Sequence, residues 1–198
     1  MKPILFNTEM VRANLAGRKT QTRRVIKYGE SHHIIGAGVY RGLETPRYGA
    51  ELETHGIVVA PYQIGDILYV RETWSLIRPS SGPTRYVYKA TDSYPFGLDG
   101  YIVKFRWRPS IHMPMEAARL FLRVTDVRAE RLQEIDGAGI RVEGTQGKHL
   151  GLATRGAFSD LWDSTIKPAD RERYGWAANP WVWVTAFERC EKIEEECV

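Results

Sequence analysis

A concentration of positive charge lies near the start of the chain, in the stretch GRKTQTRRVIK of residues 17–27. It holds five cations and no acid, and two threonines and a glutamine stand among the cations. Lys and Arg donate charge-assisted hydrogen bonds to phosphate, so the stretch can bind an anion. It can also support covalent chemistry, because a threonine hydroxyl becomes a nucleophile once a base removes its proton. A solvated basic loop is the third interpretation.

Lys19 and Thr22 are spaced for the covalent alternative, since a turn would bring side chains three residues apart together. A lysine serves as a base only if its pKa falls from about 10.4 toward neutrality, and burial and neighbouring cations both lower it. Arg24 or a backbone N–H is the candidate to stabilise an oxyanion. We expect Lys19 and Arg24 to line one concave site, which requires a turn between them, and Arg18 and Arg23 to point elsewhere.

A second group of residues that could bind a ligand begins at Glu72. Trp74 can stack on a base while the Glu72 carboxylate accepts from an exocyclic amine. The alternative is that Trp74 is a core residue and Glu72 pairs with a cation such as Arg71. His112 and Met113 stand between two prolines and are candidates for the rim of a pocket. Glu72, Trp74 and His112, with Arg24, are therefore the predicted substrate-binding residues.

Composition limits the class of protein. The chain has 198 residues, 43 % of them hydrophobic and 26 % charged, which predicts a packed domain rather than disorder. A net charge of +4 permits a nucleic-acid or phosphate-bearing partner without requiring one. The two cysteines and five histidines lack metal-ligand spacing, so we expect no metal and no cofactor. Without a signal peptide or a run of about 20 apolar residues, we expect a cytoplasmic protein with no membrane partner.

The elements that must position the basic stretch can be read from the flanking sequence. Residues 3–6 predict a strand, and Asn7 or Thr8 can cap a following helix that places Val11 and Leu15 on one face. Gly17 stands where such a helix ends in a left-handed residue. The basic stretch should therefore begin just after a helix and continue as a loop or strand.

The remaining pattern predicts an α+β fold. Strands are expected at residues 67–74 after a Gly-Asp turn, and at 85–89, 101–107, 119–128 and 181–190. Helical segments are expected at residues 130–144 and around 158–162, and residues 29–63 read as a long insertion with one hairpin. Because strands do not alternate regularly with long helices, a mostly antiparallel barrel is favoured over a doubly wound parallel sheet. Leu120, Leu122 and Val124 should face its interior.

The basic stretch resembles the signature of the ASCH domains, a branch of the PUA-like β-barrels, whose pattern is Gly-x-Lys-x-x-Glu-x-Arg. Gly17, Lys19 and Arg24 match it, and Thr22 replaces the glutamate. The segments KPILF, GDILYVRETW, IHMP, LRVTDVR and NPWVWV are similar to a subgroup of phage and prophage proteins. The resemblance implies one PUA-like, mostly antiparallel β-barrel over residues 1–198, with a few short helices and with insertions at about 29–63 and 144–178.

The threonine that stands in place of the glutamate of the ASCH pattern points to one group of these proteins. Small ASCH proteins that remove the acetyl group from N4-acetylcytidine resemble this stretch with a threonine at the same place, and their implied catalytic set is lysine, threonine and a glutamate from a later helix. The resemblance assigns these roles to Lys19, Thr22 and, in the segment IRVEG, Glu143. It implies an amidohydrolase acting on a nucleoside or single-stranded RNA. An RNA-binding module without catalysis, or a ribonuclease, stays open as the alternative.

Overall fold

The structure is a computed structural model that describes residues 1–27, 34–40, 47–52, 56–78, 83–92, 97–98, 101–102, 106–145 and 154–192. The chain divides into two compact units. Unit 1 comprises Met1–Gly17, Ile67–Leu122 and Arg189–Val198, and unit 2 comprises Arg18–Asp66 and Arg123–Glu188. No helix in the described part of the chain is long and apolar enough to cross a bilayer.

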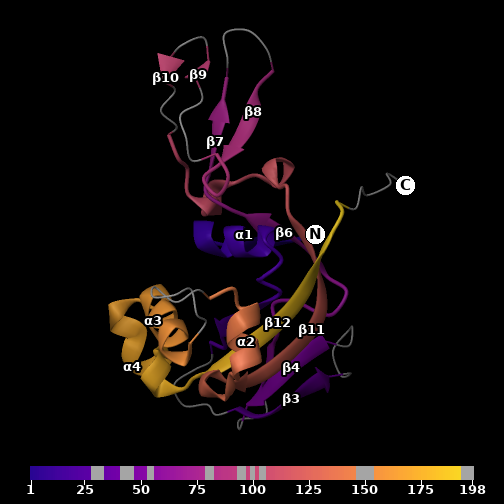
Figure 1. The fold of residues 1–198 in the computed structure, drawn as a ribbon. Helices are drawn as coiled ribbons and strands as arrows, with labels where there is room; N and C mark the ends of the chain where they lie inside the picture. Colours follow the sequence, from indigo (N-terminus) through magenta and orange to yellow (C-terminus); the bar gives the residue numbers. More distant parts are fainter. Residues whose placement is uncertain are drawn as a thin grey trace, which may run out of the picture. The chain divides into compact units, whose positions relative to one another are not determined.

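Unit 1 is built mainly from short strands. Its elements are β1 (Lys2–Leu5), α1 (Thr8–Leu15), β6 (Ile67–Arg71), β7 (Trp74–Ile77), β8 (Arg85–Tyr88), β9 (Gly97–Leu98), β10 (Tyr101–Ile102), and the 3-10 turns η1 (Ser110–His112) and η2 (Met115–Ala117) (Figure 1). β1 pairs with β6 in parallel, and the pairs β7–β8 and β9–β10 are antiparallel. The strand predicted at 101–107 begins as β10, and residues 103–105 lie outside the described residues.

The predicted start and end signals of the first helix are confirmed. Asn7 is the N-cap of α1, and its side chain accepts a hydrogen bond from the Met10 N–H at 2.8 Å. Val11 is fully buried, and Gly17 has φ +70°, which is the left-handed conformation that glycine adopts at little cost. The basic stretch then continues as a strand, as one of the two expected outcomes.

Unit 2 holds the longest strands. Its elements are β2 (Gln21–Val25), β3 (Ile34–Tyr40), β4 (Arg47–Leu52), β5 (Ile57–Val59), most of β11 (Phe121–Arg131), η3 (Leu132–Glu134), α2 (Gly137–Val142), α3 (Arg155–Thr165), η4 (Pro168–Asp170), α4 (Arg171–Tyr174), η5 (Trp176–Ala178) and most of β12 (Trp181–Cys190). Here β11, β12 and β2 are neighbours in that order, and β12 pairs with β2 antiparallel. The hairpin expected within 29–63 is confirmed as β3 and β4, and β5 extends it to three antiparallel strands.

An apolar cluster joins the helices of unit 2 to its sheet. It consists of Leu132, Ile135, Ile140, Phe158, Trp162, Val182 and Val184, all buried. The helix predicted from the spacing of Phe158, Leu161 and Trp162 is confirmed as α3. The helix predicted over 130–144 is shorter than expected, because β11 runs on to Arg131 and a 3-10 turn precedes α2. Packing against β12 therefore fixes α2 and α3, and through them the segment that carries Glu143.

The fold class agrees with the prediction at the coarse level. The described chain is a mixed α and β fold with mostly antiparallel strands and a few short helices. Leu120, Leu122 and Val124 are at most 3 % exposed, as their alternation predicted. The pairings among the described strands form open sheets and close none of them into a barrel.

Candidate reaction centre around a buried lysine

Lys19 lies immediately before β2 and is held there by backbone pairing with the end of α2. It forms an antiparallel bridge with Glu143, and the Thr20 N–H donates to the Val142 carbonyl at 2.9 Å. On the other side, the Phe187 N–H donates to the Thr20 carbonyl at 2.9 Å. The segment is thus an extended strand between two neighbours rather than a loop in solvent.

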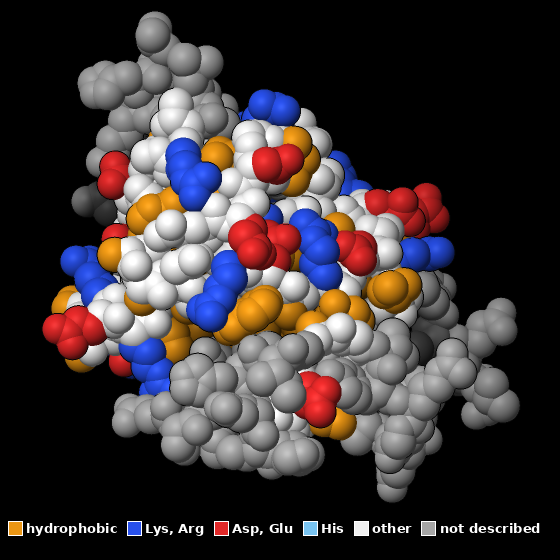
Figure 2. All heavy atoms as spheres, turned by 90° about the horizontal axis from the view of Figure 1, so that it is seen from below, with side chains coloured by type: hydrophobic (Ala, Val, Ile, Leu, Met, Phe, Trp, Pro, Cys, Tyr) orange, Lys and Arg blue, Asp and Glu red, His pale blue; other side chains and the backbone are white. Residues whose placement is uncertain are grey.

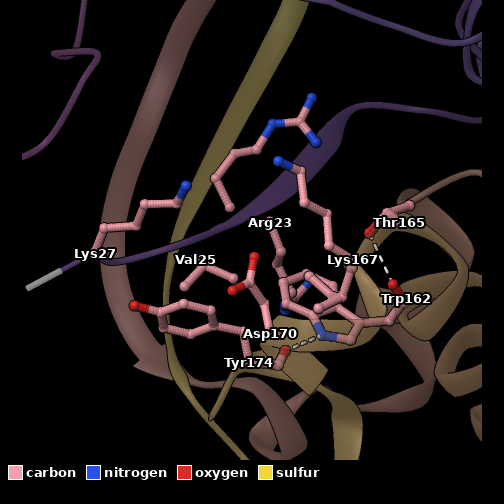
Figure 3. A pocket seen from close by; sticks show the side chains of 10 residues that line it. Arg23, Val25, Lys27, Trp162, Thr165, Lys167, Asp170 and Tyr174 are labelled. Carbon is pink, nitrogen blue, oxygen red and sulfur yellow. Dashed lines mark hydrogen bonds between the residues drawn. The ribbon is translucent and has the colours of Figure 1, made fainter. Parts of the chain in front are cut away.

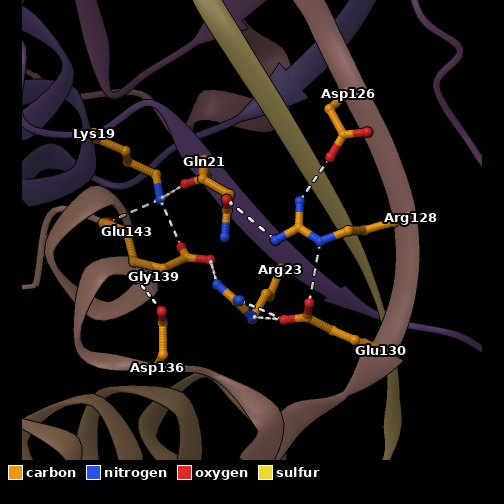
Figure 4. A network of polar contacts seen from close by, with 9 residues as sticks. All are labelled: Lys19, Gln21, Arg23, Asp126, Arg128, Glu130, Asp136, Gly139 and Glu143. Carbon is orange, nitrogen blue, oxygen red and sulfur yellow. Dashed lines mark hydrogen bonds and ion pairs between the residues drawn. The ribbon is translucent and has the colours of Figure 1, made fainter.

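The ammonium of Lys19 is enclosed by acceptors. Its Nζ donates to the Gln21 carbonyl at 2.8 Å, to the Glu143 carbonyl at 3.0 Å and to Glu143 Oε2 at 3.0 Å (Figure 4). The residue is 1 % exposed. Three acceptors match the three N–H bonds of an ammonium, which is why a charged lysine is tolerated inside the unit. The interpretation of the stretch as a solvated basic loop is therefore wrong for this residue.

Glu143 is shared by a second cation, and the polar contacts continue from there to the surface. Arg23 Nη1 donates to Glu143 Oε1 at 3.0 Å, and the same guanidinium donates to Glu130 (Figure 4). Glu130 also accepts from Arg128 at 3.2 Å, and Arg128 in turn bonds Asp126 at 2.7 Å. The side chains of Lys19, Glu143 and Arg23 are at most 6 % exposed, and exposure then increases through Glu130 and Arg128 to 47 % at Asp126. Three cations alternate with three acids, so the network is balanced in charge.

The short helix α2 positions Glu143 through its two ends. At the first end, the Asp136 side chain caps the helix by accepting from the Gly139 N–H at 2.6 Å. At the other, Glu143 is the C-cap, and Gly144 has φ +76°. A Cβ on Gly139 would lie 3.0 Å from Ile135 and 3.3 Å from Arg23 Nη2. Glycine is therefore favoured here, because a side chain would press on Ile135 and Asp136 first and on Arg23 next.

Burial lowers the pKa of Lys19 from its ordinary value of 10.5. The Glu143 carboxylate opposes this shift by charge and by hydrogen bonding, and the nearby Arg24 and Arg23 add to it. Burial is the largest of these effects. A lowered pKa is what a lysine acting as a base requires. Burial contributes more to this lowering than the neighbouring cations do.

The expected division of the arginines is wrong for Arg23. This side chain, which we expected to point away, contacts the same carboxylate as Lys19. The turn that we required between Lys19 and Arg24 is also absent, because β2 is continuous from Gln21 to Val25. Along an extended strand, residues 19, 21 and 23 share one face, which explains why Arg23 and not Arg24 joins the cluster. Arg24 is half-buried and lines a cavity together with Arg23.

Thr22 is 1 % exposed and lies opposite Thr185 in the pairing of β2 with β12. Strand alternation directs its side chain to the face of β2 opposite Gln21 and Arg23. The structure thus brings Lys19 and Glu143 into direct contact across 124 residues, whereas no such contact joins Thr22 to this pair among the described hydrogen bonds. Its role as nucleophile stays a prediction.

The other predicted ligand residues belong to unit 1. Glu72 is 1 % exposed and accepts two hydrogen bonds from Arg119, at 2.8 and 3.0 Å. Trp74 is buried in a cluster with Met113 and Ala117, and within the described residues its Nε1 has no acceptor. His112 lies in η1 and is exposed. Glu72 thus forms a packed ion pair and Trp74 is a core aromatic residue, which is the alternative that the sequence left open. Their roles toward a ligand stay predictions.

Two residues of the centre were not predicted from the sequence. Glu130 stands in β11 and Arg23 in β2, and each contacts a partner more than 100 residues away. The alternation of β2 is the signal that could have placed Arg23 beside Lys19.

Among the described residues, no group of three or more His, Cys, Asp and Glu could hold a metal ion.

Comparison with family models, with curated proteins and with solved structures gives no match to this chain.

Proposed function

We propose that this chain is an ASCH-type protein of PUA-like architecture that binds a nucleoside or an unpaired RNA base and hydrolyses the amide of an N4-acylated cytidine. The roles are Lys19 as base, Thr22 as nucleophile and Glu143 as the group that orients Lys19. We further propose that it works in the cytoplasm as a single domain with two insertions.

The observation that carries the proposal is the contact between Lys19 Nζ and Glu143 Oε2 at 3.0 Å. The motif resemblance groups the lysine and threonine of the basic stretch with a glutamate from a later helix. Glu143 is the C-cap of such a helix, and both side chains are buried. Arg23 strengthens the case, because its bond to Glu143 Oε1 holds the carboxylate in one orientation.

The proposed reaction begins when Lys19 has lost a proton, a form that burial favours. Because the two side chains lie on opposite faces of β2, we propose that a water molecule passes the Thr22 hydroxyl proton to the neutral amine, and that the threonine oxygen then attacks the acyl carbonyl carbon. Collapse of the tetrahedral intermediate breaks the C–N bond, and the Lys19 ammonium returns the proton to the leaving exocyclic amine. Water then hydrolyses the acyl-threonine, which releases the acid and restores the hydroxyl.

A binding module without catalysis is the second candidate, and one observation favours it. Three acceptors occupy the three hydrogens of the Lys19 ammonium, an arrangement that stabilises the protonated form. Figure 2 shows one face on which Lys and Arg side chains are mixed with Asp and Glu rather than gathered in one basic area. This face therefore presents no continuous basic surface that would bind a long RNA by charge alone.

The test is incubation of the wild-type protein with N4-acetylcytidine, with cytidine release followed by chromatography over a series of salt concentrations. The proposal expects release that barely responds to salt, because the nucleoside is uncharged. Phosphate-driven RNA binding would instead weaken steeply with salt. Tight, salt-sensitive RNA binding with every acylated cytidine left intact would replace the amidohydrolase with the binding module.

A further inference from the structure

A separate cavity opens beside β2 in unit 2. It has a volume of about 340 Å³, and Figure 3 shows the side chains around it. One wall comes from β2 and the residues just after it, and the other comes from α3, η4 and α4. The lining residues that carry the argument are Arg24, Val25, Lys27, Lys167, Asp170 and Tyr174. None of them was assigned a role in the reaction except Arg24.

The lining is cationic. Arg24, Lys27 and Lys167 contribute three positive charges from the two walls, and Asp170 contributes the acid. Neither lysine has a carboxylate oxygen within 4.0 Å among the described residues, so their charge is available to a ligand. Arg23 also lines the cavity, but its guanidinium already donates to Glu130 and Glu143.

The second wall offers an aromatic and apolar surface held in place by buried contacts. Trp162 Nε1 donates to the Tyr174 carbonyl at 2.8 Å, which ties α3 to α4. Tyr174 is half-buried, and Ile166 packs against the apolar cluster of the unit, as does Val25 from the first wall. Cations on both walls, together with such a surface, match a ligand with a phosphate group and a planar body.

We propose that this cavity binds the phosphate group of a nucleotide. The volume lies at the small end of the range for small-molecule sites, which suits a mononucleotide or one residue of a strand and is too small for a folded partner. The proposal deepens the proposed function and rests on it for the choice of cytidine. Arg23 connects the two sites, because it lines the cavity and also donates to Glu143.

The test is calorimetric titration of the full-length wild-type protein with cytidine 5′-monophosphate and with cytidine. We expect the monophosphate to bind at least about tenfold more tightly, the scale of one hydrogen bond to a charged group. Lys27→Gln and Lys167→Gln should each weaken binding of the monophosphate about threefold, since both side chains are exposed, and should leave cytidine binding unchanged. Lys192→Gln, an exposed lysine outside the cavity, is the matched control and should change neither.

A short cytidine-containing RNA with and without a 5′-phosphate distinguishes the source of the phosphate. Dependence on the terminal phosphate assigns a strand end, and equal lysine-dependent binding of both strands assigns an internal phosphate. Equal affinity for cytidine and its monophosphate would overturn the proposal, as would an equal loss in the Lys192→Gln control. Phosphate binding by a protein that never releases cytidine would leave this site standing and refute only the amidohydrolase.

Discussion

Replacing Glu143 with glutamine tests the energetics of the reaction centre, because it removes one charge and keeps the shape. The carboxylate lies 3.0 Å from Lys19 Nζ and 3.0 Å from Arg23 Nη1. At an effective dielectric constant of about 20, each contact corresponds to roughly 5 kcal/mol of Coulomb energy. Arg23 keeps its bond to Glu130, so the main loss falls on Lys19.

Two considerations bound the size of that loss. Breaking a buried ion pair by removing one partner costs about 3–5 kcal/mol. Lys19 can also escape by losing its proton, which at pH 7 costs about 5 kcal/mol for a lysine with an ordinary pKa. We therefore expect Glu143→Gln to reduce the free energy of unfolding by about 3–5 kcal/mol at pH 7. The penalty should shrink as pH rises, since deprotonation of Lys19 becomes easier.

Urea denaturation followed by both tryptophan emission and circular dichroism measures the effect and checks two-state behaviour. Glu9→Gln is the matched control, because Glu9 forms an ion pair of similar length, 2.9 Å, with Arg12, but its side chain is 76 % exposed. That substitution should cost at most about 1 kcal/mol. Equal losses in the two variants would refute the claim that burial of the Lys19–Glu143 pair sets its strength.

Three further predictions concern the surroundings of the pair. Gly139→Ala should destabilise the protein by about 1–3 kcal/mol, because the new methyl group would press on Ile135 and Arg23. Gly137→Ala is the control and should be neutral or stabilising by up to about 1 kcal/mol, because the nearest neighbour of its methyl group is 3.7 Å away. Equal effects of the two substitutions in thermal denaturation would contradict this prediction. With the pKa of Lys19 lowered by burial, the unfolded state binds more protons between that lowered value and 10.5, so the free energy of unfolding should rise with pH in this window and the rise should vanish in Lys19→Met. Urea titrations below about pH 9, where a tyrosine of ordinary pKa is still largely protonated, measure the difference in slope, and identical slopes would be the contrary result. Asn7→Ala should cost about 1 kcal/mol in the same urea assay, because α1 loses its N-cap, and an unchanged midpoint would count against that contact.

Much of the fold followed from local signals in the sequence. Asn7 and Gly17 marked the two ends of α1. The alternation of Leu120, Leu122 and Val124 identified a buried strand. Both signals are readable from the sequence because capping and the alternation of buried residues depend on neighbours in the chain. The extent of the helix before Glu143 could not be predicted this way. Its length is set by where β11 ends and by packing against β12, which are tertiary effects.

The candidate site, like the fold, could be predicted only in part from the sequence. The pairing of Lys19 with Glu143 was implied by the motif's resemblance and is present as a direct contact. Arg23 was misplaced, because the expected turn is replaced by a continuous strand that puts Arg23 on the face of Lys19. Glu130 carries no sequence signal of its own, since its role depends on β11 approaching β2 from more than 100 residues away.

The most direct test of the central claim is the rate of cytidine release from N4-acetylcytidine by four proteins: the wild type, Lys19→Met, Thr22→Val and the double variant. Both substitutions keep the buried volume close to the original, and circular dichroism at the assay temperature establishes that each variant is folded. The account predicts release by the wild type, a loss of about 10²–10⁴-fold in each single variant and scarcely more in the double variant, because residues that act as one unit are strongly non-additive. Folded wild-type protein that releases no cytidine would contradict it, and turnover that survives in Thr22→Val would remove the threonine as nucleophile.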